Sequence, residues 1–326
     1  MNKIVLFEQK INRELESFCK QLPGNPTELY EPIKYILSNG GKRVRPMMVL
    51  LGCDLFENES EKAIPTALGV ELFHNFTLIH DDLMDDAPLR RNHLTVHEKW
   101  NKNISILSGD AMLVKAYELL SRTNSEKLSQ VLTVFNTTST QVCEGQQLDM
   151  NYEKAHKISI VQYLRMIELK TAVLLGASFK MGALIGGARE EDAQRLYDFG
   201  KNLGIAFQLQ DDILDVYGDE KKFGKQKGGD IISNKKTFLL VKAMEIANRY
   251  NAEELANWVF APQFDSRQKV EAVTAIYDFL NVRELAEKAA KKYYETALSY
   301  LKEIPVNEAK KQELIDYTNS LIYREK

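Results

Sequence analysis

Residues 76–85 read FTLIHDDLMD, and the pattern returns 130 positions later (211 − 81), where residues 207–215 read FQLQDDILD. In each copy an apolar run leads into Asp-Asp-x-x-Asp. If both runs are helical, residues four apart share a face, so the first and last aspartates of each copy lie side by side. Like charges at this spacing weaken a helix. The pattern therefore predicts bound divalent cations, and magnesium suits a few carboxylates with water and phosphate oxygens around it.

The composition fits a globular enzyme and excludes several other classes. The chain has 326 residues, of which 44% are hydrophobic and 27% charged, enough for a large core. A net charge of −3 gives no basic face for nucleic acid. The three cysteines, Cys19, Cys53 and Cys143, lack metal-ligand spacing and indicate a reduced, cytoplasmic protein. The N-terminus has no signal-peptide core, and the apolar stretch 171–188 contains Lys180, which favours a buried helix over a transmembrane segment.

Apolar residues recur at helical spacing along nearly the whole chain. A first helix is expected to start at Asn25, with this residue as its cap and proline at its first position. The further expected helices cover roughly residues 44–55, 63–82, 105–121, 125–150, 158–187, 190–217, 235–250, 266–281, 283–303 and 307–323. No alternating run between hairpin turns predicts a strand, and no linker divides the chain. The sequence therefore predicts one all-helical domain over residues 1–326.

Positive charge accompanies the acidic motifs in a fixed order. Residues 40–46 read GGKRVRP, in which two glycines free the backbone and three cations follow. This segment lacks the spacing of a Walker A loop, but arginine forks a phosphate and lysine adds a compact charge. Arg90 and Arg91 follow the first acidic motif, as Lys225 and Lys235 follow the second. This order predicts two polyanionic ligands, one held through metal ions and the other directly by cations.

Four motifs together resemble a known family, the trans-polyprenyl diphosphate synthases, which includes the farnesyl and geranylgeranyl diphosphate synthases. They are DDxxDxxxxRR at 81–91, GGKRxRP at 40–46, Lys170-Thr171, and QxxDDxxD at 208–215. They span roughly residues 35–240 in family order, with no motif broken. The resemblance implies the isoprenoid synthase fold, an all-α, single-domain antiparallel helical bundle around a deep central cavity. It also implies a homodimer.

The resemblance assigns metal-binding and diphosphate-binding roles. The implied metal ligands are Asp81, Asp82, Asp85, Asp211, Asp212 and Asp215. Asp81 and Asp85 would hold a pair of magnesium ions and Asp211 one more, giving about three per active site, with the other aspartates supporting. The residues implied for the diphosphate of isopentenyl diphosphate are Lys42, Arg45, His74 and Arg91. The residues implied for the allylic diphosphate are Arg90, Lys170, Thr171, Gln208, Lys225 and Lys235. Gln146 and Asp149 are weaker supporting candidates.

The implied reaction is the magnesium-dependent head-to-tail condensation of isopentenyl diphosphate with an allylic diphosphate. Breaking the allylic carbon–oxygen bond leaves a diphosphate and an allyl cation, so fixed positive charge must stabilise the leaving group. The implied catalytic residues are Asp81, Asp85, Arg90, Lys170, Thr171, Gln208, Asp211, Lys225 and Lys235. By resemblance, the Thr171 carbonyl and the Gln208 side-chain oxygen face the cation, and the departing diphosphate accepts the proton.

Product length is expected to depend on side chains below the first acidic motif. In an ideal helix Thr77 lies one turn below Asp81 and Phe73 two turns below it, with Phe76 to one side. An aromatic residue at 76, a small one at 77 and an uninterrupted motif resemble synthases of the twenty-carbon product, geranylgeranyl diphosphate. A farnesyl product follows if Phe73 or Phe76 closes the pocket. Both phenylalanines also suit ordinary core packing.

Other readings share parts of the pattern. A class I terpene cyclase has no need for a second Asp-Asp-x-x-Asp or for the 40–46 cations. A non-catalytic partner subunit is expected to have lost acidic residues, whereas all six motif positions are present. A calcium-binding module needs a flexible oxygen-rich loop rather than helices. The C-terminal residues 323–326 either place a cation over the site or form a frayed tail, which is the commoner case.

Overall fold

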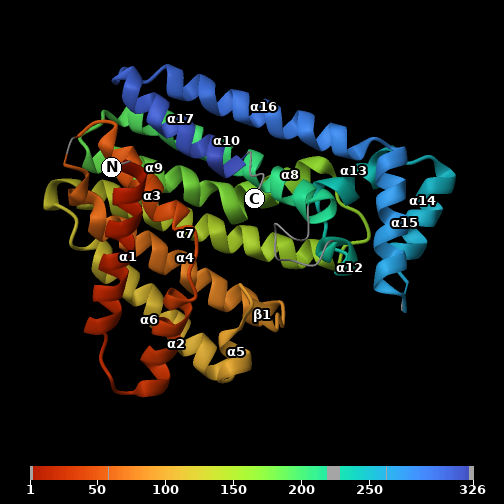
Figure 1. The fold of residues 1–326 in the computed structure, drawn as a ribbon, viewed down its shortest axis with the longest axis horizontal. Coiled ribbons are helices and arrows are strands. Elements are labelled where there is room, and N and C mark those ends of the chain that lie inside the picture. The colour runs from red at the N-terminus through yellow and green to blue at the C-terminus, as the bar shows by residue number, and fades with distance from the viewer. Residues whose placement is uncertain (1–2, 58, 219–227, 262, 323–326) are drawn as a thin grey trace. The chain divides into compact units, whose positions relative to one another are not determined.

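The structure is a computed structural model that describes residues 3–57, 59–218, 228–261 and 263–322. Within them the chain consists of helices and one short hairpin (Figure 1), which confirms the all-α prediction. The first elements are α1 (Lys3–Gln21), α2 (Thr27–Ser38), α3 (Val44–Asp54), η1 (Ser60–Ala63), α4 (Ile64–Met84), β1 (Leu89–Arg90), β2 (His93–Leu94), α5 (Val96–Lys99), α6 (Lys102–Leu120) and α7 (Ser125–Glu153). The later elements are α8 (Ile160–Ile167), η2 (Glu168–Ala172), α9 (Val173–Ile185), α10 (Glu190–Tyr217), α12 (Gly229–Ile232), α13 (Phe238–Ile246), α14 (Arg249–Val259), α15 (Ser266–Phe279), α16 (Val282–Lys302) and α17 (Glu308–Ile322).

The chain divides into two compact units built from interleaved segments. Unit 1 comprises Met1–Thr137, Ala177–Tyr197 and Pro305–Lys311. Unit 2 comprises Thr138–Gly176, Asp198–Ile304 and Gln312–Lys326. The expectation of one domain over residues 1–326 stays a prediction. The first acidic motif belongs to unit 1 and the second to unit 2.

Unit 1 is held together by close packing at small residues. In Figure 1, α4 and α6 lie side by side. A Cβ atom on Gly69 of α4 would lie 2.9 Å from Leu120 Cγ of α6. A Cβ atom on Gly182 of α9 would lie 2.0 Å from the Val49 carbonyl oxygen of α3. Glycine at 182 therefore lets the two backbones touch, as expected for a buried helix rich in small residues. Among the described residues, no helix is long and apolar enough to cross a membrane.

Unit 2 has its own apolar core, to which α8, α10, α13, α15 and α16 contribute. Leu239 and Leu255 are fully buried in it, as are Val282 and Ala286. Helix α13 follows the second acidic motif and inserts an almost wholly apolar sequence into this core. The core therefore fixes α8, α10 and α13 against one another, and these helices carry the polar side chains described below.

Several element boundaries differ from the sequence expectations. Pro26, rather than Asn25, precedes α2 as its cap, and it makes no side-chain hydrogen bond. The helix expected at 158–187 is interrupted by a π-helical turn, η2. The helix expected at 235–250 ends at Ile246, and α14 begins after Asn248, whose side chain accepts from the Asn251 backbone at 2.9 Å. Helices α1 and α14 were not expected, although each has an apolar face, with Ile11 and Leu15 of α1 and Leu255 and Val259 of α14 buried.

Candidate functional site

The first acidic motif occupies the C-terminal end of α4. Asp81 and Asp82 lie in its last turn, and Asp85 caps it by donating its backbone N–H to the Asp81 carbonyl oxygen at 2.9 Å. The C-terminal end of a helix carries partial negative charge, so carboxylates there are unfavourable unless cations compensate them. Asp81 is half-buried and Asp85 is exposed. Both side chains therefore reach solvent at a position that favours a bound cation.

Asp82 differs from these neighbours because it is buried and paired. Only 2% of Asp82 is exposed. Arg90 Nε donates to both carboxylate oxygens at 2.8 Å, and Arg90 Nη2 lies 2.6 Å from Oδ1. Burial raises the pKa of Asp82, against the effect of Arg90. Burial would lower the pKa of Arg90, but Asp82 raises it above its ordinary value. The motif thus holds Arg90, a predicted ligand of the allylic diphosphate, through a buried bidentate pair.

A two-stranded hairpin carries Arg90 and Arg91. Strand β1 pairs with β2 in antiparallel register, with Arg90 opposite His93. The turn residues Arg91 and Asn92 have φ of 52° and 64°, and positive φ at both positions is what a two-residue type I′ turn requires. Asparagine adopts this conformation readily, whereas arginine is strained in it. The conformation of this turn sets the direction in which the Arg91 side chain leaves the hairpin.

Arg91 lies against the glycine pair that precedes α3. Its Nη1 atom donates to the Gly40 carbonyl oxygen. A Cβ atom on Gly41 would lie 2.7 Å from Arg91 Nη1, and Gly41 has φ of 134°. Both facts require glycine at 41, because any side chain would displace the guanidinium and strain the backbone. The structure therefore joins two motifs that the sequence separates by about 50 positions.

Arg45 and His74 form another contact within the predicted isopentenyl set. Arg45 Nη1 lies 3.0 Å from His74 Nε2. A guanidinium can only donate, so this imidazole nitrogen accepts and His74 is neutral. Burial and the charges of Arg45 and Arg91 lower the pKa of His74 well below its ordinary value. Burial lowers the pKa of Arg45 to about 10, with Glu71 opposing. Arg45 Nε is buried without a hydrogen-bond partner among the described residues, and Lys42 is exposed in the loop before α3.

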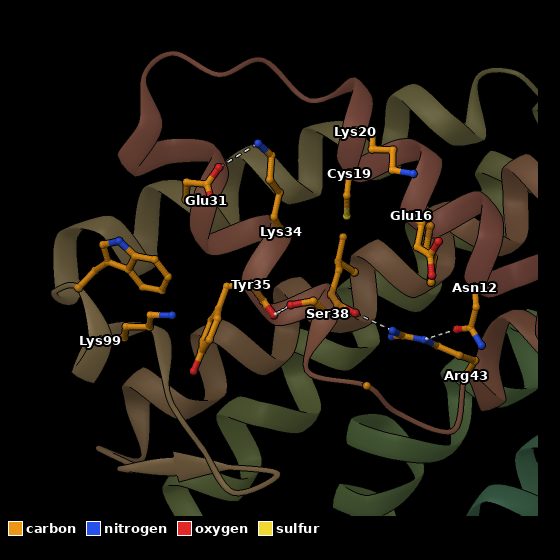
Figure 2. Close-up of a pocket in the computed structure, with 14 residues that line it drawn as sticks. Asn12, Glu16, Cys19, Lys20, Glu31, Lys34, Tyr35, Ser38, Arg43 and Lys99 are labelled. Atoms are coloured by element: carbon orange, nitrogen blue, oxygen red, sulfur yellow. Dashed lines mark hydrogen bonds and ion pairs between the residues drawn. The ribbon is translucent and has the colours of Figure 1, made fainter.

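Arg43, the remaining cation of residues 40–46, is buried in an ion pair and supports the loop. It is 6% exposed, and its Nη1 lies 2.7 Å from Glu71 Oε1. Figure 2 shows its guanidinium turned toward Asn12 at the edge of a cavity of about 880 Å³. This cavity, between α1, α2 and Trp100, is lined by none of the predicted metal or diphosphate ligands. Arg43 therefore anchors the loop that carries its neighbours.

The predicted chain-length residues lie on α4, and two of them belong to a cluster of aromatic rings. Phe73 is 1% exposed, with its ring centroid 5.1 Å from that of Phe135 and 5.7 Å from that of Phe76. Phe76 is half-buried, and its ring lies 4.7 Å from that of His80. Thr77 Oγ1 donates to the His74 carbonyl oxygen at 2.7 Å, which leaves a small, satisfied side chain below Asp81. Phe73 thus belongs to the core, and Phe76 flanks the motif.

The second acidic motif lies near the C-terminal end of α10. Its middle aspartate, Asp212, is 3% exposed. The Tyr163 hydroxyl donates to Asp212 Oδ2 at 2.5 Å, and so does the Phe238 backbone N–H at 2.8 Å. Gln208 Nε2 donates to Asp212 Oδ1 at 3.2 Å. Burial raises the pKa of Asp212 to about 7, with the Tyr163 hydrogen bond opposing. Asp212 therefore has three donors, none of them a cation.

Asp211 and Asp215 are half-buried on the same helix. Asp215 Oδ2 accepts from the Asp230 backbone N–H at 3.0 Å, and the Asp215 carbonyl oxygen accepts from Gly228 at 2.8 Å. The Lys235 backbone N–H then donates to the Asp230 carbonyl oxygen at 2.9 Å. These bonds tie the turn that carries Lys235 to the acidic motif. Lys225, also predicted for the site, lies outside the described residues.

Lys170 and Thr171 lie on the π-helical turn η2, Glu168–Ala172. Such turns insert an extra residue into a helix and often occur at functional sites. A Cβ atom on Gly145 of α7 would lie 2.2 Å from the Lys170 backbone nitrogen, so glycine permits the close approach. Thr171 Oγ1 lies 3.3 Å from Gln208 Oε1, and Lys170 Nζ lies 2.6 Å from Asp149 Oδ2. Among the residues that the structure describes, the predicted allylic residues of unit 2 thus gather at one place.

These side chains line a narrow pocket of about 40 Å³. Its lining includes Asp149, Tyr163, Lys170, Thr171, Gln208, Asp212 and Lys235. Gln146 lies one position after Gly145, and both polar atoms of its side chain are buried without a hydrogen-bond partner among the described residues. A buried amide without partners is costly unless a ligand or water satisfies it. Three lysines, Lys170, Lys235 and Lys236, line the pocket, so its lining suits a negatively charged ligand.

The donor set fits magnesium. Each motif places carboxylates near the negative end of a helix, where a cation lowers their repulsion. Within residues 3–57, 59–218, 228–261 and 263–322, no three acidic, histidine or cysteine side chains form a closed metal site. Magnesium is usually held by one or two carboxylates, with waters and substrate phosphates completing its shell. Asp81, Asp85 and Asp211 are accessible enough to act in this way, whereas Asp82 and Asp212 have other partners.

Two residues of this region were missed by the sequence reasoning. Tyr163 precedes Lys170 by two helical turns, a spacing that could have drawn attention to it. Lys269 is fully buried, and its Nζ lies 2.6 Å from Asn234 Oδ1 and 3.9 Å from the centroid of the Phe264 ring. It supports the turn before Lys235 from a helix more than 30 positions away. No sequence pattern links these two segments.

Comparison with known proteins gives consistent results. Residues 26–277 match the polyprenyl synthetase family. A geranylgeranyl diphosphate synthase of Methanosarcina mazei is 42% identical over 222 residues, which are 68% of each chain. A geranylfarnesyl diphosphate synthase of Natronomonas pharaonis is 35% identical over 249 residues, 71% of this chain and 73% of that one. A crystal structure of a geranylgeranyl pyrophosphate synthase superposes with a TM-score of 0.94 at 40% identity and covers 100% of both chains.

Proposed function

Because the chain belongs to the polyprenyl synthetase family and is a short-chain prenyltransferase, we propose that its principal product is geranylgeranyl diphosphate. Family membership implies magnesium-dependent catalysis on isopentenyl diphosphate and an allylic diphosphate. The single observation that carries the assignment is the gathering of Lys170, Thr171, Gln208 and Asp212, the middle residue of the second acidic motif, around one pocket. About three magnesium ions per site belong to the same proposal.

Support for the twenty-carbon product comes from α4. Thr77 is small and lies one turn below Asp81. Phe73 packs on Phe135 in the core, and Phe76 flanks the motif. Relatives at comparable identity include a geranylgeranyl and a geranylfarnesyl synthase, so the length of the product depends on local side chains rather than on the family. In this proposal the floor of the cavity lies beyond Thr77.

In the proposed reaction, the residues around the allylic diphosphate bind it and stabilise the negative charge that develops on it. Magnesium, when bound, acts as a Lewis acid on the leaving diphosphate. Arg90, oriented by Asp82, contacts the allylic diphosphate together with Lys170, Lys225 and Lys235. Fixed positive charge there stabilises the developing negative charge without reorganisation.

The second substrate is held by cations of unit 1. Lys42, Arg45 and Arg91 bind the diphosphate of isopentenyl diphosphate. Neutral His74 accepts from Arg45 and keeps its guanidinium in place. The Thr171 carbonyl and the Gln208 oxygen face the allyl cation, which the double bond of isopentenyl diphosphate attacks. The new carbon–carbon bond leaves a cation on the isopentenyl unit. A carbon atom next to this cation then loses a proton, which the departing diphosphate accepts.

The test is a product assay by mass spectrometry. The protein is incubated with magnesium, isopentenyl diphosphate and, separately, dimethylallyl, geranyl or farnesyl diphosphate. Extension of farnesyl diphosphate by a single isoprene unit, with no further growth, is the expected result. Accumulation of farnesyl diphosphate would make Phe73 or Phe76 the floor, and condensation with none of the primers would contradict the assignment.

A homodimer is part of the same proposal. Helix α6 exposes Leu107 and Val114 by 60% and 65%, seven residues apart and hence on one face. Ile106 and Tyr117 extend this apolar stripe. Exposed apolar stripes of this kind are typical of association surfaces. Light scattering is expected to show a dimer for the natural chain and a smaller species after Leu107→Glu with Val114→Glu.

A further inference from the structure

Tyr163 is a buried polar residue with no part in the mechanism above. It lies on α8, is 1% exposed, and its hydroxyl donates to Asp212 Oδ2 at 2.5 Å. A buried hydroxyl is costly unless it is bonded, and phenylalanine would fill the same volume without that requirement. The hydroxyl therefore serves its partner, Asp212.

The bonds around Asp212 have a fixed direction. Tyr163 and the Phe238 backbone N–H both donate to Oδ2, which leaves Oδ1 to accept from Gln208 Nε2 at 3.2 Å. If the Gln208 amide were flipped, its oxygen would face a carboxylate oxygen, and two acceptors would oppose each other. The carboxylate thus selects one of the two amide orientations. In that orientation Gln208 Oε1 points away from Asp212 and lies 3.3 Å from Thr171 Oγ1.

We infer that Tyr163 is a positioning residue that, through Asp212, fixes the Gln208 amide with its oxygen toward the developing allyl cation. The inference rests on the proposed function, because it concerns the pocket where that cation forms. A carbonyl oxygen stabilises positive charge, whereas the N–H end of a flipped amide repels it. Asp212 is then an orienting group for Gln208, in addition to any influence on the neighbouring metal ligands.

Tyr163→Phe tests this role because it removes one donor and keeps the ring. The Phe238 backbone N–H is then the remaining donor to Asp212 Oδ2, so the carboxylate is held less firmly, and it in turn orients the Gln208 amide less firmly. We expect kcat to fall roughly tenfold. The KM for isopentenyl diphosphate and the magnesium concentration for half-maximal rate are expected to stay unchanged, since neither depends on Gln208.

The matched control is Tyr294→Phe. Tyr294 is also buried, at 8% exposed, and also donates its hydroxyl to a side chain, Asn319, within unit 2. It does not line the pocket. We expect this variant to keep the kcat of the natural chain while losing a similar amount of thermal stability.

A double-mutant cycle separates positioning from general support of the fold. In a Gln208→Ala background, which lowers activity by itself, Tyr163→Phe is expected to cause no further loss, because the amide it positions is gone. An equal loss in both backgrounds would overturn the inference, and so would a shift in the magnesium requirement. An unchanged kcat in Tyr163→Phe, with the natural chain active, would also overturn it. An inactive natural chain would instead contradict the proposed function.

Discussion

The two acidic motifs share a sequence pattern but lie in different surroundings. In unit 1, Asp82 is neutralised by the guanidinium of Arg90, with Arg45 and Arg91 nearby in the same unit. In unit 2, Asp212 is surrounded by a phenol, an amide and a backbone N–H. In each motif the middle aspartate is the buried one, so it organises neighbours while the outer two remain accessible.

The difference lies in what each buried aspartate orients. Asp82 orients the guanidinium of Arg90, as the proposed diphosphate site requires. Asp212 orients a neutral amide, whose oxygen offers a dipole to the proposed carbocation. The same three-aspartate pattern thus orients a cation in one unit and a neutral amide in the other, because the partners of the buried aspartate come from different parts of the chain.

The largest expected effect concerns what the motifs have in common. Asp81→Ala and Asp211→Ala should each lower turnover roughly a thousandfold or more, since each removes an accessible metal ligand. Steady-state assays with circular dichroism as a check on folding would measure this. The control is Asp86→Asn, an exposed acid paired with Lys102 at 2.8 Å, where asparagine tolerates the positive φ. If only one motif variant lost activity, the two motifs would not share a metal-binding role.

The next effect separates the two buried aspartates. Asp82→Asn leaves Arg90 without its counter-charge, and should lower the free energy of unfolding by roughly 3 kcal/mol. Asp212→Asn removes the acceptor for one neutral donor and should cost roughly 1 kcal/mol. Urea denaturation of both variants would rank them. Equal losses would mean that the cation beside Asp82 makes no special contribution.

A smaller effect concerns only the predicted isopentenyl diphosphate site of unit 1. Gly41→Ala places a methyl group where the Arg91 guanidinium lies, and should raise the KM for isopentenyl diphosphate roughly tenfold through the loss of one charge-assisted contact. Gly24→Ala is the control, because no atom lies within 4 Å of its added Cβ. An unchanged KM in Gly41→Ala would remove Arg91 from the isopentenyl site.

The smallest effect is a pH dependence of stability. The pKa of His74 is lowered in the folded protein from an ordinary value of 6.5, so below that pH the unfolded chain binds a proton that the folded protein excludes. Stability should therefore rise with pH up to about 6.5, by at most about 1.4 kcal/mol per pH unit.

His74→Gln keeps an acceptor for Arg45 but cannot titrate, so it provides the comparison. The natural chain should gain stability relative to this variant as the pH increases from about 5 to about 7. Thermal unfolding across that range would measure the gap. A gap that does not change with pH would show that His74 titrates normally.

The sequence was sufficient for features set by local spacing. The helices that carry both acidic motifs were predicted with small errors, because long apolar runs define them. The link between Asp82 and Arg90 spans eight positions and lies within one recognised motif. Features that depend on distant packing were not predictable. The π-helical turn at Lys170 and Thr171 requires the close approach of Gly145, and no local pattern encodes it.

The partner of Asp212 shows the same limit. Tyr163 lies 49 positions earlier, on a helix whose sequence gives no reason to place its hydroxyl against a carboxylate. Lys269 reaches the turn before Lys235 from 35 positions beyond Asn234. Motifs therefore predicted residues that act on the substrates, and this stays a prediction, whereas the side chains that pack against those residues became visible only in three dimensions.

The most direct test of the division between the motifs is a count of bound magnesium. Equilibrium dialysis would use the natural chain, Asp81→Ala and Asp211→Ala in the presence of inorganic diphosphate. The expected counts are about three ions for the natural chain, about one for Asp81→Ala and about two for Asp211→Ala. The same count in all three proteins would contradict the assignment of these aspartates as metal ligands.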